Sequence, residues 1–179
     1  MHSLNFGDWV ANTARCIVIL SAILSTDCTG ARTASPLTMD QSAATTNSVR
    51  AFAGAVADDV TARGPLAWRD HFAETPSFFM AAEGQLVFAN SDAATRGIKE
   101  LPRRIAHIEL RWGDPVLVDP LTTALAMMAA PYHEVEVDPA GHRVESSGYF
   151  TGLVELGSAG WKFRNAHWSV AAAPTSPAP

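Results

Sequence analysis

The spacing of hydrophobic residues changes once along this chain, near Arg104. Before that point they recur every three or four residues, as in Val49, Phe52 and Val56. Over residues 106–112 apolar and polar side chains alternate instead. The first spacing is typical of an amphipathic helix and the second of a strand with one buried face. Helices followed by strands predict an α+β fold, in which the helices pack on one face of the sheet.

Turn and cap residues set the expected element boundaries. The helical half is predicted to hold a helix from Ser48 to Gly64, a short helix after Pro65, a hairpin over 77–89 and a helix over 91–101. The strands are expected at 106–112, 122–137, 143–156 and 161–170. Pro131 interrupts the second of these strands, and we expect a bulge or an edge position there.

The N-terminal region has the pattern of a secretory signal. Residues 16–24 form a nine-residue apolar stretch after Arg15, and small or polar residues follow through Ala31. Nine helical residues rise about 14 Å, too little for a stable membrane span. We therefore predict a signal peptide over 1–31 and a secreted or periplasmic protein. A buried N-terminal helix is one alternative, and a lipoprotein anchored through Cys28 is another.

Low-complexity sequence flanks the expected domain. Residues 32–47 and 171–179 consist largely of Ala, Thr, Ser and Pro without hydrophobic periodicity. Such segments cannot bury enough apolar surface to fold, so we predict a disordered linker and a disordered tail. The structured domain is then expected over 48–170, a length that suits one core.

Charge and motifs exclude several functional classes. Thirteen Lys and Arg against eighteen Asp and Glu give a formal net charge of −5, without a basic run that could bind nucleic acid. Both cysteines, Cys16 and Cys28, fall in the first 28 residues, and no phosphate-binding loop or nucleophile elbow is found. We expect neither a metal nor a cofactor.

Three local strings resemble the SnoaL-like branch of the nuclear transport factor 2-like superfamily. They are the first-hairpin run over 78–84, the Ser147–Thr151 run, and the Gly-Trp-Lys and His-Trp-Ser strings within 160–169. The resemblance implies a cone-shaped half-barrel, a curved antiparallel sheet with the N-terminal helices on its concave face around a pocket. It also implies frequent dimerisation through the sheet, and it covers isomerases, cyclases, dehydratases and non-catalytic binding modules.

His167 is the first candidate for acid/base chemistry. On an alternating strand it shares a face with Trp161, Phe163, Asn165 and Ser169, and in the family that this chain resembles the inner face of this strand lines the pocket. An imidazole there can exchange a proton near neutral pH. A structural histidine is the favoured alternative, because the His-Trp-Ser string recurs in family members of unrelated function.

Asp70 is a second candidate acid. It lies beside Trp68 and Phe72 on the short second helix, flanking its apolar face. Apolar and amide side chains complete the candidate pocket, and any one of them can equally be plain core. The candidate ligand-binding residues are Trp68, Phe72, Phe78, Met80, Phe88, Met127, Phe150, Trp161, Phe163 and Asn165.

Two charged groups are interpreted as solvated surface. His107, Glu109 and Arg111 alternate with apolar residues, and we expect them to face outward. The acidic and histidine residues over 133–142 could suggest a metal site, but Glu134 and Glu136 point opposite to His133. A solvated charged hairpin is the favoured interpretation.

The sequence therefore predicts a domain that binds a small apolar or amphipathic molecule. Two alternatives remain: a cofactor-free isomerase, cyclase or dehydratase that uses His167, and a non-catalytic dimeric interaction module. The expected partners are a small molecule and a second copy of the chain, without nucleic acid.

Overall fold

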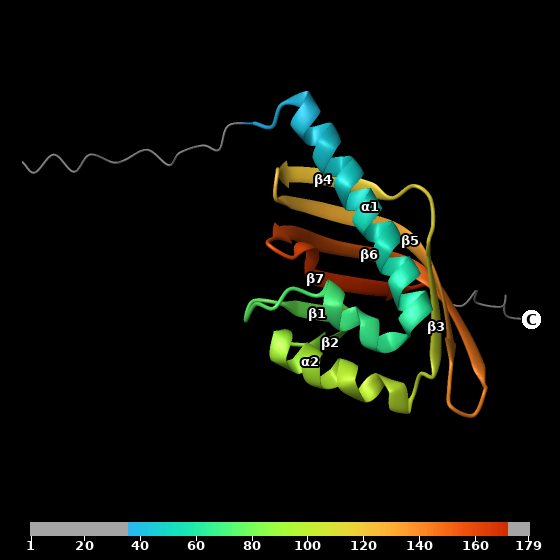
Figure 1. Cartoon of the computed structure of the whole chain (residues 1–179). Helices are drawn as coiled ribbons and strands as arrows, with labels where there is room; N and C mark the ends of the chain where they lie inside the picture. The colour runs from blue at the N-terminus through green and yellow to red at the C-terminus, as the bar shows by residue number, and fades with distance from the viewer. Residues whose placement is uncertain (1–35, 172–179) are drawn as a thin grey trace, which may run out of the picture. The chain divides into compact units, whose positions relative to one another are not determined.

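A computed structural model describes residues 36–171 of this chain (Figure 1). The predicted signal peptide over 1–31 and nearly all of the predicted tail over 171–179 lie outside the described residues. Helices and strands follow the predicted order. The helical elements are α1 (Met39–Arg63), η1 (Pro65–His71), α2 (Ser91–Glu100) and η2 (Leu101–Arg103). The strands are β1 (Phe79–Ala82), β2 (Gln85–Phe88), β3 (His107–Trp112), β4 (Leu117–Thr122), β5 (Leu125–Val137), β6 (Arg143–Gly157) and β7 (Gly160–Val170).

The first helix begins earlier than predicted. Thr38 caps α1 through a capping box, in which its hydroxyl accepts from the Gln41 N–H and the Gln41 side chain accepts from the Thr38 N–H. The prediction of a disordered linker through residue 47 is therefore wrong over 39–47. Ser48 lies inside the helix, and its hydroxyl accepts a 2.8 Å hydrogen bond from the Trp161 indole.

One mixed sheet forms the second layer. Its strand order is β2-β1-β7-β6-β5-β3, and β4 pairs with the free part of the β5 edge. The expected all-antiparallel sheet is corrected at one place, because β1 runs parallel to β7. Strand β4 was not predicted as a strand; it forms the first arm of the hairpin that leads into β5.

Pro131 lies inside a continuous strand. β5 pairs with β6 from Leu125 to Val137 without a register shift, so the expected bulge is absent. On its other edge β5 pairs first with β4 and then with β3, and Pro131 falls between the two partners. Its carbonyl accepts a 2.8 Å hydrogen bond from the Gly113 N–H on that edge. The missing N–H of Pro131 faces the gap, where no ladder hydrogen bond is lost.

The helices pack on the concave face of the curved sheet, as predicted (Figure 1). Val49, Val56 and Val60 of α1 are fully buried, and they join Met128 and Phe150 of the sheet in one hydrophobic cluster. Among the described residues, no helix is long and apolar enough to cross a membrane.

Candidate functional site

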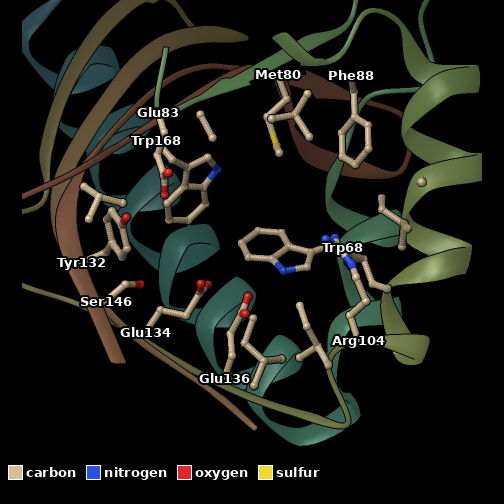
Figure 2. A pocket seen from close by; sticks show the side chains of 18 of the residues that line it. Trp68, Met80, Glu83, Phe88, Arg104, Tyr132, Glu134, Glu136, Ser146 and Trp168 are labelled. Carbon is tan, nitrogen blue, oxygen red and sulfur yellow. The ribbon is translucent and has the colours of Figure 1, made fainter. Parts of the chain in front are cut away.

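A cavity of about 690 Å³ opens between the sheet and α2. Its walls come from the C-terminal halves of β5 and β7 and the N-terminal end of β6 on one side, and from α2 and η2 on the other. Side chains of η1 and of the β1–β2 hairpin contribute further (Figure 2). This volume falls in the range of pockets that hold cofactor-sized or drug-sized molecules.

Aromatic and aliphatic side chains form most of the cavity wall. Trp68 stacks on Phe72 with ring centroids 5.6 Å apart, and its edge meets Trp168 at the same distance. Met80 and Phe88 project from the first hairpin on the opposite side (Figure 2). These rings hold one another in place, so the apolar wall is preformed.

Three polar side chains on β5 enter the cavity from one strand face. Tyr132, Glu134 and Glu136 are spaced two residues apart and therefore point the same way. Ser146 of β6 pairs with Glu134 and also lines the cavity. Figure 2 shows both carboxyl groups pointing into the open space beside the Trp68 indole.

Burial changes the acidity of these groups. Desolvation raises the pKa of Glu134 to about 7, and the charge of Glu136 adds to the shift. Desolvation also raises the pKa of Glu136, while Arg104 lowers it. The pKa of Tyr132 is raised by burial and by the charge of Glu134. A carboxyl group poised near neutral pH can both donate and accept a proton under physiological conditions.

Neither carboxyl group has a counter-ion at salt-bridge distance. Within residues 36–171, no Lys, Arg or His nitrogen comes within 4.0 Å of the Glu134 or Glu136 oxygens. Arg104 follows η2 and is the single basic residue among the described side chains that line the cavity. Glu83 lies at the exposed mouth, in the turn between β1 and β2.

Four of the predicted ligand-binding residues line the cavity: Trp68, Phe72, Met80 and Phe88. Four others are buried in the core away from it: Phe78, Phe150, Trp161 and Phe163. Met127 is 40% exposed on the outer face, because the inward phase of β5 belongs to its even-numbered residues. The Asn165 side chain accepts a hydrogen bond from the Leu153 N–H and does not reach the cavity.

The structure places His167 on the outer face of β7, where it is exposed. The prediction that it shares a face with Trp161 and Phe163 is wrong, because β7 contains a bulge. Phe163 pairs with Val154 and Asn165 with Leu153, so Arg164 is an extra residue. One extra residue reverses the alternation beyond it, and Trp168 points into the cavity in place of His167 (Figure 2).

Asp70 lies outside the cavity. It forms an ion pair with Arg63 at 2.7 Å, and its side chain is 58% exposed. Arg63 also pairs with Asp59, which contacts His71 at 2.7 Å. This network joins the end of α1 to η1, and none of its four residues lines the pocket.

Two groups of charged residues were predicted to be solvated surface, and the structure confirms this prediction for one group only. His107, Glu109 and Arg111 face outward as expected, opposite to the buried Ile108 and Leu110.

The interpretation of the 133–142 segment as a solvated hairpin is wrong for Glu134 and Glu136, which line the cavity. Their orientation opposite to His133 is correct, and His133 faces Glu145 on the outer side at 3.5 Å. Within the described range 36–171, no three His, Cys, Asp or Glu side chains gather as a metal site.

The sequence held a signal for the polar wall. Counting every second residue of β5 from Met128 passes through Ala130 and Tyr132 to Glu134 and Glu136. One continuous strand keeps all of these on one face. The interpretation of the two glutamates as solvated surface rested instead on their charge, because carboxylates are seldom buried without a partner.

Solved structures with the same architecture identify the fold. A nuclear transport factor 2-like superfamily protein from Salmonella enterica serovar Typhimurium matches with a TM-score of 0.63 at 11% identity, over 75% of this chain and 96% of its own. The described domain has the nuclear transport factor 2-like fold. The sequence itself matches no protein-family model and no curated protein.

Two further structures with the nuclear transport factor 2-like fold carry the names of enzymes. A Novosphingobium aromaticivorans protein, provisionally named a scytalone dehydratase, matches with a TM-score of 0.63 at 11% identity, over 75% of this chain and 89% of its own. A type 2 hexachlorocyclohexane dehydrochlorinase matches with a TM-score of 0.57 at 10% identity, over 76% and 95%. At these identities the likeness establishes the fold, and function must be argued from the site.

Proposed function

We propose that this domain binds a small amphipathic molecule in the cavity between β5, β6 and α2. The observation that carries the proposal is the cavity of about 690 Å³, whose apolar walls surround a few inward polar groups. Preformed apolar concavities with convergent polar groups are the usual form of small-molecule sites. A domain that served only as an interaction module would fill this space with side chains.

Two adjacent serines near the start of β6 provide a matched test. Ser146 lines the cavity, whereas its neighbour Ser147 is exposed on the outer face. A Ser146→Trp substitution places an indole in the cavity, and Ser147→Trp places the same group in solvent. Native mass spectrometry of protein purified from its own host is expected to show a retained small molecule in the wild type and in Ser147→Trp. Ser146→Trp is expected to lose it.

If Ser146→Trp retains the small molecule, that molecule binds outside this cavity. A wild-type chain that carries no small molecule, and that binds nothing from a host metabolite extract, would contradict the proposal. Circular dichroism of both variants checks that the fold is intact.

A second candidate function is proton transfer without a cofactor, with Glu134 in the role first given to His167. The observation that favours it is the pKa of Glu134 near 7 inside a cavity that also presents the Tyr132 and Ser146 hydroxyls. Glu134 would accept a proton from a carbon next to a carbonyl. A hydroxyl group would donate a hydrogen bond to the oxygen as negative charge develops.

Deuterium exchange into 2-tetralone tests this second function, because its protons next to the carbonyl are acidic. The wild type in D₂O is expected to accelerate exchange above the buffer rate, and Glu134→Gln to lose about a hundredfold of that acceleration. Glu145→Gln, on the outer face, is the matched control. Equal rates with wild type and Glu134→Gln would exclude Glu134 as the base.

Export and dimerisation are two further proposals. The apolar segment at 16–24 supports removal of a signal peptide. Met127 and Tyr149 on the outer face of the sheet, 40% and 39% exposed, support a homodimer through that face.

A further inference from the structure

The charged groups around the cavity are predominantly acidic. Glu83, Glu134 and Glu136 line it, together with Glu100, which is paired with Arg103. Arg104 is the basic residue among the described lining side chains, and its charge acts on Glu136. Among the described lining residues there are therefore one guanidinium group and three carboxyl groups that have no ion-pair partner. The cavity has an electrostatic preference for positive charge.

The two inner carboxyl groups are placed to share one cation. Glu134 and Glu136 leave the same face of β5 two residues apart, so their backbone origins are about 7 Å apart. Their carboxyl groups both point into the open space (Figure 2). Two carboxylates held this close in a desolvated site repel one another, and a cation between them removes that repulsion.

Aromatic rings surround the same space. Trp68 and Trp168 meet nearly perpendicularly at 84°, and Tyr132 meets Trp168 at 85° with centroids 4.8 Å apart. Figure 2 shows the Trp68 indole extending into the cavity beside the carboxyl groups of Glu134 and Glu136. Ring faces attract cations, and indole attracts them most strongly. Carboxylates and aromatic faces in one cavity form the usual recognition set for an ammonium group.

We propose that the ligand of this cavity is an organic cation, with an ammonium nitrogen between Glu134, Glu136 and Trp68 and an apolar body against Phe88 and Met80. The proposal rests on the proposed function and names its ligand class. A neutral ligand of the same shape would enclose two carboxyl groups without partners, which costs binding free energy. An anionic ligand would gain from Arg104 alone and be repelled by the acidic pair.

Three probes that share a naphthalene ring and differ in charge separate these ligand classes. 2-Naphthylmethylamine, 2-naphthylmethanol and 2-naphthoate are titrated into the full chain at pH 8 by isothermal titration calorimetry. The amine is expected to bind at least tenfold more tightly than the alcohol, and the carboxylate to bind most weakly. Amine affinity is also expected to rise several-fold from pH 6 to pH 8, because Glu134 with its pKa near 7 ionises over this range while the amine stays protonated.

Two sets of variants locate the effect. A Glu134→Gln and Glu136→Gln double variant is expected to bind the amine and the alcohol equally, because the amine loses its counter-charges and the alcohol no longer encloses carboxyl groups without partners. Glu145→Gln, on the outer face, is expected to keep the wild-type preference. Ser146→Trp is expected to bind none of the three probes.

The possible failures are distinguishable. If the alcohol binds as tightly as the amine, and Ser146→Trp abolishes both, the cavity binds small molecules but the cation proposal is wrong. Preference for the amine that survives in the double variant would also overturn it. If none of the probes binds the wild type, both this proposal and binding of an amphipathic molecule at this site are contradicted.

Discussion

The two halves of β5 present the same alternation to different surroundings. In the first half Met128 and Ala130 point inward and have no exposed surface, because they lie in the cluster that includes the α1 valines. In the second half Tyr132, Glu134 and Glu136 point inward from the same face and border the cavity. Both halves pair with β6 in one unbroken register. The alternation decides which side chains point inward, and the opposing layer decides whether that side is core or pocket.

Charge at matched positions gives the strongest contrast between the halves. Met128→Glu places an unpaired carboxylate in the first half of β5, where the inward side chains lie in the core. We expect the free energy of unfolding to fall by about 4 kcal/mol or more. In the second half, Glu134 points inward from the same face of β5, but it borders the cavity and the fold accommodates it. Urea unfolding measures the loss.

Met127→Glu is the matched control for that variant. Met127 is 40% exposed on the outer face, so the same charge there is expected to change stability by about 1 kcal/mol or less. Equal losses at residues 127 and 128 would show that the two faces of the first half are not distinct.

A smaller effect is the pH dependence of the pocket half. The pKa of Glu134 is raised from 4.5 to about 7 in the folded chain, so between these pH values the folded state holds a proton that the unfolded state has released. Stability that is present below pH 4.5 is therefore lost as pH rises through 7. We expect the wild type to lose about 2–3 kcal/mol over this interval relative to Glu134→Gln.

Urea unfolding at pH 5 and pH 8 provides the measurement. Glu145→Gln should retain the wild-type pH dependence in this range, because the pKa of Glu145 is lowered by Arg143. A parallel pH profile in wild type and Glu134→Gln would mean that Glu134 is solvated like the outer carboxylates.

The smallest expected effect is that of His167→Gln. His167 is exposed on the outer face of β7, so we expect a stability change within about 0.5 kcal/mol and unchanged ligand binding. Thermal unfolding and the amine titration check both. A lost affinity would place His167 in contact with the ligand and contradict the assigned face of the strand.

The element order and the helices on one face were predictable from the sequence, because they follow from periods of 3.6 and 2 that hold over many residues. The errors occurred where one residue alters a strand. Pro131 suggested an interruption that the gap between β3 and β4 makes unnecessary, and Arg164 introduced a bulge that no turn residue marks. The bulge moved His167 to the outer face, and the acidic wall was missed because carboxylates are usually solvated.

The bulge at Arg164 also bears on how such a site can diversify. Point substitutions alter one side chain at a time, whereas a regular pairing in which Arg164 lies opposite Leu153 would reverse every position of β7 that follows it. His167 and Ser169 would then take the inward places of Trp168 and Val170. The outer face of β7 thus carries a second, more polar set of side chains, which a shift of one residue in the pairing with β6 would turn toward the pocket.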